Sequence, residues 1–328
     1  MVEPSIVPKK DRGIWSRLLL DNSIVVALVA LFFVFYFSIP IFGTTRNLTN
    51  ILLESSVTAI IAVGMTFVII AKEIDLSVGS VLCFCGMVYA SLSVAGVNVV
   101  LGFIITLGAG FMIGTINGMA TMWLRIPSFI VTLAMMTIAR GAALLWRNGE
   151  SIRGMTRDYL WFGQKEIIGM PVPVFLLLVV GVSGFMILKF TKFGLHTYSI
   201  GGNSEAARLA GIRVKLVDVL IFALAGTCAA ISGVITTSRL GIGSPITGNG
   251  KELDAIAAVV LGGASLNGGK GSVIGSLAGA LTVTMLGNGM TLLRVSSYWQ
   301  RVLIGIVIVV ALAFQRDSGL MSLLKRER

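Results

Sequence analysis

The stretch that decides the class of this protein is Ser23-Ile-Val-Val-Ala-Leu-Val-Ala-Leu-Phe-Phe-Val-Phe-Tyr-Phe-Ser-Ile-Pro-Ile-Phe42, whose one ionisable side chain is the neutral Tyr36. A helix needs about 20 apolar residues to cross the hydrocarbon core of a bilayer. In lipid the backbone must satisfy its own hydrogen bonds, so such a run must be helical. Basic residues precede the stretch and no cleavage site follows it, so we expect an uncleaved signal anchor.

The composition extends this expectation to the whole chain of 328 residues. It is 55% hydrophobic and only 12% charged, with a mean hydropathy of +0.93, whereas about a quarter of a soluble protein is charged. The net charge of +11 does not indicate nucleic-acid binding, because the basic residues form no stripe with interleaved aromatics. Three cysteines, all in apolar runs, predict no disulfide framework.

Hydropathy predicts an all-α, polytopic membrane protein with about ten transmembrane helices. The eighth expected segment is too short to cross alone, and a broken helix of this kind occurs where backbone is buried in protein or lines a cavity. The ten segments are Ser23–Phe42, Ile51–Ala71, Val78–Val94, Val99–Trp123, Ser128–Trp146, Val172–Phe190, Leu216–Ser238, Asp254–Gly262, Ser272–Asn288 and Ser297–Gln315.

The distribution of Lys and Arg predicts the orientation, because cytoplasmic loops carry the excess of basic residues. With both termini in the cytoplasm, 16 of the 26 basic residues lie inside and nine outside, leaving aside Arg140 within a span. We therefore expect a cytosolic tail at 1–22, a membrane domain at 23–315 and a second cytosolic tail at 316–328.

Glycines repeat every four residues in two of the expected spans, at Gly110, Gly114 and Gly118 and at Gly271, Gly275 and Gly279. Small residues at this spacing let helices approach closely in lipid, so we assign these glycines to helix packing. The two spans are five apart and run in opposite directions, which fits an inverted repeat.

The expected cytosolic segment 191–215 contains a compact surface helix. Asn203 or Ser204 can cap it, Glu205 suits its first turn and Gly211 can end it. Such a short helix is not stable alone, so we expect another element or protein to pack on it.

Two motif-like stretches lack residues that their chemistry needs. Ala264–Gly271 resembles a phosphate-binding loop but has Ala264 in place of the first Gly and Gly271 in place of the Mg²⁺-binding Ser or Thr. We therefore expect no ATP hydrolysis by this chain. Ser183 in Gly-Val-Ser-Gly lacks a base, because the one histidine, His196, lies in the expected cytosolic segment. An intramembrane enzyme and a zinc site are thus disfavoured.

Polar residues at or inside spans are candidates for the transport pathway. Asp75 and Asp254 each precede an apolar run, and we favour helix capping over substrate binding for both. Asn117 and Asn288 are more central, and interhelical hydrogen bonding is the simpler expectation. No acid lies at a clear mid-span depth, which argues against proton coupling.

Three stretches resemble the ribose-type sugar permeases of ABC importers. Ala62–Ser80, with Ile-Asp-Leu-Ser-Val-Gly-Ser at its end, is similar to the family signature. Gly201–Ile212 resembles the cytoplasmic coupling segment, and Thr247–Gly271 resembles the most recognisable stretch of the family. The similarity runs along nearly the whole chain. The family places Gly where this chain has Lys72 or Glu73, and this extra charge pair leaves the identity of the substrate open.

The resemblance implies a type II ABC importer fold and a permease subunit that forms the pathway for a monosaccharide such as ribose. It implies a homodimer or a dimer with a similar permease, a cytosolic tandem-domain ATPase that holds ATP and Mg²⁺, and an extracytoplasmic sugar-binding protein. No cofactor is expected in this chain, and the resemblance implies that it is located in a bacterial cytoplasmic (inner) membrane. The residues expected to couple to the ATPase are Asn203, Glu205, Ala206, Ala207, Arg208 and Gly211, with Ala206 and Ala207 forming the docking face. The alternative is a self-sufficient secondary transporter of a small polar solute, with inverted repeats and a midplane site.

Overall fold

The computed structural model describes residues 23–306 and 309, and this part of the chain is mostly helical. Its one sheet is a two-stranded hairpin of β1 (Glu166–Ile167) and β2 (Met170–Pro171). The helices are α2 (Ser23–Ser38), α3 (Thr45–Ile70), α4 (Val78–Val94), α5 (Val99–Leu124), α6 (Ser128–Leu145), η1 (Arg157–Leu160), α7 (Trp161–Gln164), α8 (Val172–Phe190), α9 (Lys192–Gly202), α10 (Ser204–Leu209), α11 (Val214–Leu240), α12 (Lys251–Leu261) and α13 (Val273–Leu292). Residues 297–306 form a further helix.

Each expected span coincides with a helix over its described part. Six of the described helices are long and apolar enough to cross a membrane: α3, α5, α6, α8, α11 and α13. The chain is therefore a polytopic helical membrane protein. Residues 307–308 and 310–315 of the last expected span, and the expected tails 1–22 and 316–328, lie outside the described residues.

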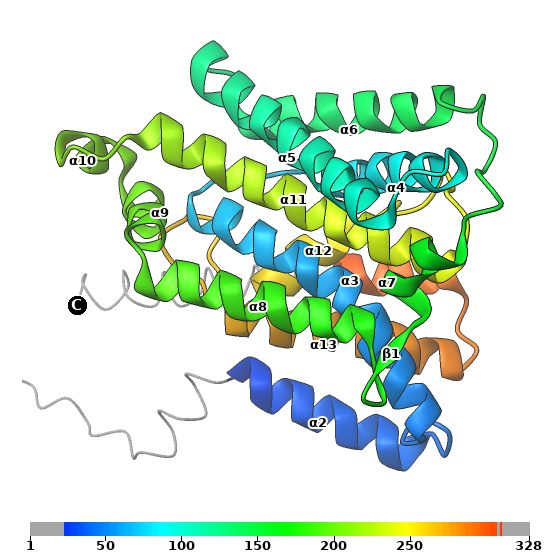
Figure 1. Ribbon diagram of the computed structural model, residues 1–328. Coiled ribbons are helices and arrows are strands. Elements are labelled where there is room, and N and C mark those ends of the chain that lie inside the picture. Colours follow the sequence, from blue (N-terminus) through cyan, green and yellow to red (C-terminus); the bar gives the residue numbers. More distant parts are fainter. Residues whose placement is uncertain (1–22, 307–308, 310–328) are drawn as a thin grey trace, which may run out of the picture.

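Two long helices, α3 and α11, form the centre of the bundle. In their most apolar windows 89% of α3 and 72% of α11 is buried, against 22% of α5, so α3 and α11 face protein on most sides and α5 presents an outer face. Helix α11 packs against α5, α3 and α4, while α2 packs against α13 at one edge (Figure 1). Fully buried side chains such as Met65 and Phe222 fill the core between the central helices.

The first glycine stripe lies in the interface between α5 and α11. Gly110, Gly114 and Gly118 face Gly226, Phe222 and Val219, and a Cβ atom at any of the three would collide with the backbone of α11. Backbone contact at this range is possible only because the side chains are absent. The second stripe lies beside α12, where Gly275 and Gly279 contact Gly262 and Ala258, and Gly271 lies beside Ala264 and Ile70.

Helix α12 has the broken form expected of the eighth span, but it begins at Lys251 and its N-cap is Gly250. The expectation that Asp254 caps this helix is wrong, because Asp254 lies inside the helix and its carboxylate pairs with Lys251. Eleven residues extend only about 16 Å, so α12 crosses part of a bilayer. Arg140 of α6 donates to the carbonyls of Pro245 (3.1 Å) and Thr247 (2.7 Å) and so satisfies the non-helical backbone before α12.

Candidate functional site

A polar cavity of about 530 Å³ lies at the end of the bundle remote from α10. Its walls come from α3, α11, α12, α13 and the helix at 297–306. Pockets of 300–1,000 Å³ are typical of small-molecule sites, so the volume suits a small solute. The polar side chains that line it are Glu54, Thr58, Thr236, Arg239, Lys251, Asp254, Thr284, Thr291 and Gln300.

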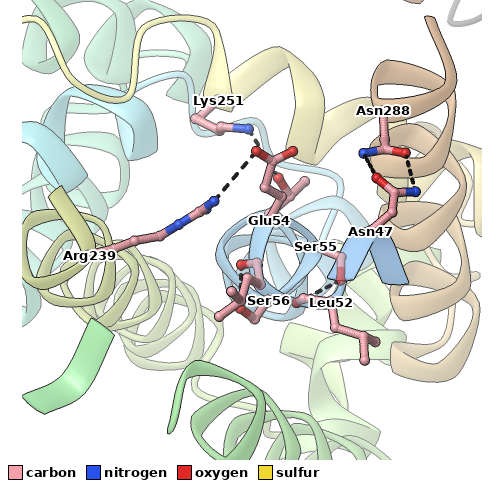
Figure 2. A network of polar contacts seen from close by, with 10 residues as sticks. Asn47, Leu52, Glu54, Ser55, Ser56, Arg239, Lys251 and Asn288 are labelled. Carbon is pink, nitrogen blue, oxygen red and sulfur yellow. Dashed lines mark hydrogen bonds and ion pairs between the residues drawn. The ribbon is translucent and has the colours of Figure 1, made fainter. Parts of the chain in front are cut away.

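Four charged side chains in this cavity form two ion pairs. Arg239 of α11 lies 3.7 Å from a carboxylate oxygen of Glu54 on α3, as Figure 2 shows. The ammonium of Lys251 lies 3.0 Å from Asp254 within α12 and donates a 3.3 Å hydrogen bond to Thr58. Two cations balance two anions, so the cavity has no net charge from these side chains.

The charged side chains of α11 and α12 lie at the ends of their helices, and these two ends meet at the cavity. Arg239 lies in the last turn of α11, and Asp254 lies in the first turn of α12. A cation near a helix C-terminus and an anion near an N-terminus are favoured by the helix dipole. Gly241 ends α11 in the left-handed conformation (φ +68°), and this turn returns the chain toward α12.

The arrangement suits a neutral solute that carries hydroxyl groups. A hydroxyl both donates and accepts hydrogen bonds, and the cavity offers carboxylate acceptors, guanidinium and ammonium donors, and threonine hydroxyls. Part of the polar lining is reachable by solvent, because the Glu54 side chain is 53% exposed and that of Asp254 is 22% exposed. Among the described residues no group of three or more His, Cys, Asp and Glu side chains could hold a metal ion.

Of the four polar residues singled out in the sequence, only Asp254 lines this cavity. Asp75 and Asn117 instead lie together, both buried, around Ser77 at the start of α4. The carboxylate of Asp75 accepts hydrogen bonds from the backbone N–H (2.8 Å) and the hydroxyl (2.6 Å) of Ser77, the residue that caps α4. The Asn117 amide donates to the same hydroxyl at 2.9 Å. This network fixes the start of α4 against α5.

Asn288 forms a reciprocal pair with Asn47 of α3. Each side-chain amide donates to the oxygen of the other, at 2.9 and 3.0 Å (Figure 2). The pair joins α13 to α3, and it is an interhelical contact of the kind that amide side chains make in membranes.

Sequence reasoning missed Glu54, Arg239, Lys251 and Gln300 as members of one site. Each is a polar residue near a span end, and such residues are common at membrane boundaries. Glu54 and Arg239 are separated by most of the chain and meet only because α3 packs on α11. Opposite charges at the ends of neighbouring helices were the available signal.

The expected surface helix is α10, which follows α9 at the other end of the bundle (Figure 1). Asn203 caps α10, and its side-chain oxygen accepts from the N–H of Ala206 at 3.0 Å. Arg208 donates to Glu205 at 3.1 Å and lowers the pKa of that exposed carboxylate. Gly211 follows the helix in the left-handed conformation (φ +87°).

The docking face expected on this helix needs one correction. Ala207 is only 5% exposed and belongs to the core of this chain, whereas Ala206 is exposed and Leu209 is 74% exposed. A helix of six residues places adjacent positions about 100° apart, so Ala206 and Ala207 cannot share one outward face. The outward surface consists of Ser204, Glu205, Ala206, Arg208 and Leu209.

Long apolar helices around a polar cavity, with a short exposed helix at the opposite end, define a multi-pass membrane protein with the architecture of a solute transporter. A family model described as "Branched-chain amino acid transport system / permease component" matches residues 47–312. The chain belongs to this permease family.

Individual relatives are similar over almost their whole length. The chain is 41% identical to the ribose import permease protein of Escherichia coli (strain K12), over 89% of this chain and 92% of the relative. It is 37% identical to the D-allose transport system permease protein of the same strain (87% and 90%). It is 36% identical to the L-arabinose ABC transporter permease protein of Azospirillum brasilense (96% and 93%). The expected resemblance to ribose-type permeases is thereby confirmed. No solved structure matches the chain.

Proposed function

We propose that this chain is the membrane-spanning permease subunit of an ATP-driven importer for a monosaccharide such as ribose. The observation that carries the proposal is the neutral cavity lined by Glu54, Arg239, Lys251 and Asp254 together with threonine hydroxyls. Relatives named for ribose, D-allose and L-arabinose support the substrate class. All three sugars are neutral and rich in hydroxyl groups, which is the chemistry that the cavity matches.

The proposed assembly has three further components. A second copy of the chain completes the pathway, a cytosolic tandem-domain ATPase docks on the outward surface of α10, and an extracytoplasmic binding protein delivers sugar to the cavity end. The chain crosses the membrane ten times with both termini in the cytoplasm. ATP and Mg²⁺ belong to the ATPase. The cavity and α10 lie near opposite ends of α11, and this separation supports the division of roles.

In the proposed cycle, ATP shifts the ATPase toward its closed form because it binds that form better. The motion reaches the permease through α10 and α9, which pack on each other and on α11. Opening of the cavity end would stretch or open the exposed Glu54–Arg239 pair, which lies at that end of α3 and α11. An exposed pair is worth at most about 1 kcal/mol, so the ion pair itself adds little to the energy of this step.

Reconstitution tests the proposal. The permease is placed in proteoliposomes with and without its ATPase, and radiolabelled ribose is supplied with the cognate binding protein. We expect uptake only when both partners and ATP are present, with ATP hydrolysis stimulated by the sugar-loaded binding protein. Uptake by the permease alone, driven by an ion gradient, would instead establish the secondary-transporter alternative. ATP-driven uptake of a different solute, with ribose and related sugars inactive, would remove the substrate assignment and leave the importer assignment intact.

A further inference from the structure

A groove of about 250 Å³ lies between α8, α9 and the start of α13, separate from the sugar cavity. Its apolar wall consists of Phe185, Leu188, Leu195 and Val273, and its polar side chains include Lys189 and Tyr198. In Figure 1 these three helices meet at the end of the bundle that carries α9 and α10. The groove therefore combines an apolar wall with polar side chains at this end of the bundle.

The groove lies where the bundle reaches the expected boundary of the membrane. Helix α8 is a candidate membrane span, and Lys189 lies in its last turn. Basic side chains at such positions extend toward the headgroups of lipids while their carbon stems stay in the apolar region. Leu195, on α9 beyond the span, is 64% exposed, which leaves the apolar wall accessible on the outer side of the bundle.

The groove is cationic without compensation from its own walls. Helices α8, α9 and α13 contain no Asp or Glu, and among the described residues no carboxylate forms an ion pair with Lys189. The Lys189 ammonium lies 5.2 Å from the ring centroid of Phe185 and 5.5 Å from that of Phe190. These cation–π contacts hold the ammonium beside the apolar wall, since Phe185 is part of that wall.

Charge and position together select the occupant. Basic pockets between transmembrane helices bind the headgroups of anionic lipids, whereas zwitterionic lipids offer no net charge to the ammonium. The volume corresponds to roughly eight water molecules at about 30 Å³ each, which accommodates a phosphate headgroup with the first carbons of an acyl chain. We propose that the groove between α8, α9 and α13 binds an anionic phospholipid, with the phosphate at Lys189 and the acyl chain along Phe185 and Leu195.

The lipid proposal does not depend on which solute the permease carries. Helix α9 packs on both α8 and α10, so a bound lipid contacts the element that leads to the proposed docking helix. Tyr198 of α9 donates a 2.7 Å hydrogen bond to the carbonyl of Gly271 at the start of α13, which ties the two walls of the groove together.

Native mass spectrometry tests the proposal on the full chain. The protein is exchanged into mixed micelles with equal phosphatidylglycerol and phosphatidylcholine, and retained lipids are counted. We expect retained phosphatidylglycerol in the wild type. Lys189→Gln should weaken its binding about fivefold, the effect of one basic residue near an anionic headgroup. Lys192→Gln is the matched control, because Lys192 carries the same charge but does not line the groove, and it should retain wild-type binding.

Two further readouts make the result decisive. A photoreactive phosphatidylglycerol should crosslink to peptides of α8 and α9, and not to those of α5 and α6. All three proteins should unfold at the same temperature in phosphatidylcholine alone, which excludes a folding defect. Equal lipid retention by Lys189→Gln and wild type would overturn the proposal, as would equal losses in both variants. Loss of ATPase binding with unchanged lipid retention would assign the groove to a protein partner and also overturn it.

Discussion

At the scale of the residue, position within a helix decides what each polar side chain does. Asp254 and Asp75 look alike in the sequence, since each is an acid before an apolar run. Asp75 is 1% exposed and bonds to Ser77 at the start of α4, whereas Asp254 faces a solvent-accessible cavity with Lys251 as its partner. The first is a structural group and the second is available to a solute.

Asp254→Asn should lower sugar uptake about tenfold or more in the reconstituted importer. The substitution removes a charged acceptor whose hydrogen bond to a hydroxyl is worth about 1.5–3 kcal/mol, and it leaves Lys251 without its carboxylate. The control is Glu150→Gln, because Glu150 is an exposed carboxylate outside the cavity. Initial rates of ATP-dependent uptake, with expression levels matched, measure the effect. Equal rates for Asp254→Asn and wild type would exclude Asp254 from the pathway.

Substitution by glutamate should have different effects at the two adjacent alanines of α10. Ala206→Glu adds a charge to the exposed surface, so the protein should fold normally but bind its ATPase weakly. Ala207→Glu buries an unpaired charge in the core, which costs several kcal/mol, so the folded yield should fall. Size-exclusion chromatography reports folding, and co-purification reports ATPase binding. Normal ATPase binding by a folded Ala206→Glu variant would contradict the docking assignment.

At the scale of the element, the long helices form from apolar sequence, and glycine decides which helices can touch. The glycines of α5 lie against α11, and Gly226 of α11 packs directly on Gly110 and Gly114. Because both backbones are in contact, the interface depends on the absence of side chains more than on their fit.

Gly114→Ala should destabilise the protein by about 1–3 kcal/mol, the typical cost of overpacking. The added methyl group would collide with the backbone of Phe222 and Ala223. Gly108→Ala is the matched control on the same helix, because a Cβ there meets nothing within 4 Å and alanine is the better helix former. Thermal unfolding in detergent compares the two. An unfolding temperature for Gly114→Ala that equals that of Gly108→Ala would refute close packing of α5 on α11.

At the scale of the whole molecule, the polar cavity lies at the C-terminal end of α11, whereas α10 precedes the N-terminus of α11, so the two lie at opposite ends of one helical bundle (Figure 1). Helices α11 and α13 extend between these ends and are 27 and 20 residues long, enough to cross a bilayer. The two ends must therefore face different aqueous compartments.

Cysteine labelling in intact cells tests this orientation. A membrane-impermeant thiol reagent should label Thr291→Cys, which lines the cavity, and should not label Ser204→Cys on α10 until the membrane is permeabilised. The background should be low because Cys83, Cys85 and Cys228 are all buried. Labelling of Ser204→Cys in intact cells would reverse the proposed orientation.

The sequence by itself determined the helical membrane class, the positions of the long apolar helices and the permease family, whereas it did not predict η1, α7 or α9. Lipid permits only helices or closed barrels, so runs such as Ser23–Phe42 have few alternative structures. Only the tertiary structure decided which polar residues share a site. Glu54, Arg239 and Asp254 meet through the packing of α3, α11 and α12. Ala207 likewise turns inward because α10 packs on its own chain. These choices depend on contacts between distant segments, which no local pattern of apolar residues specifies.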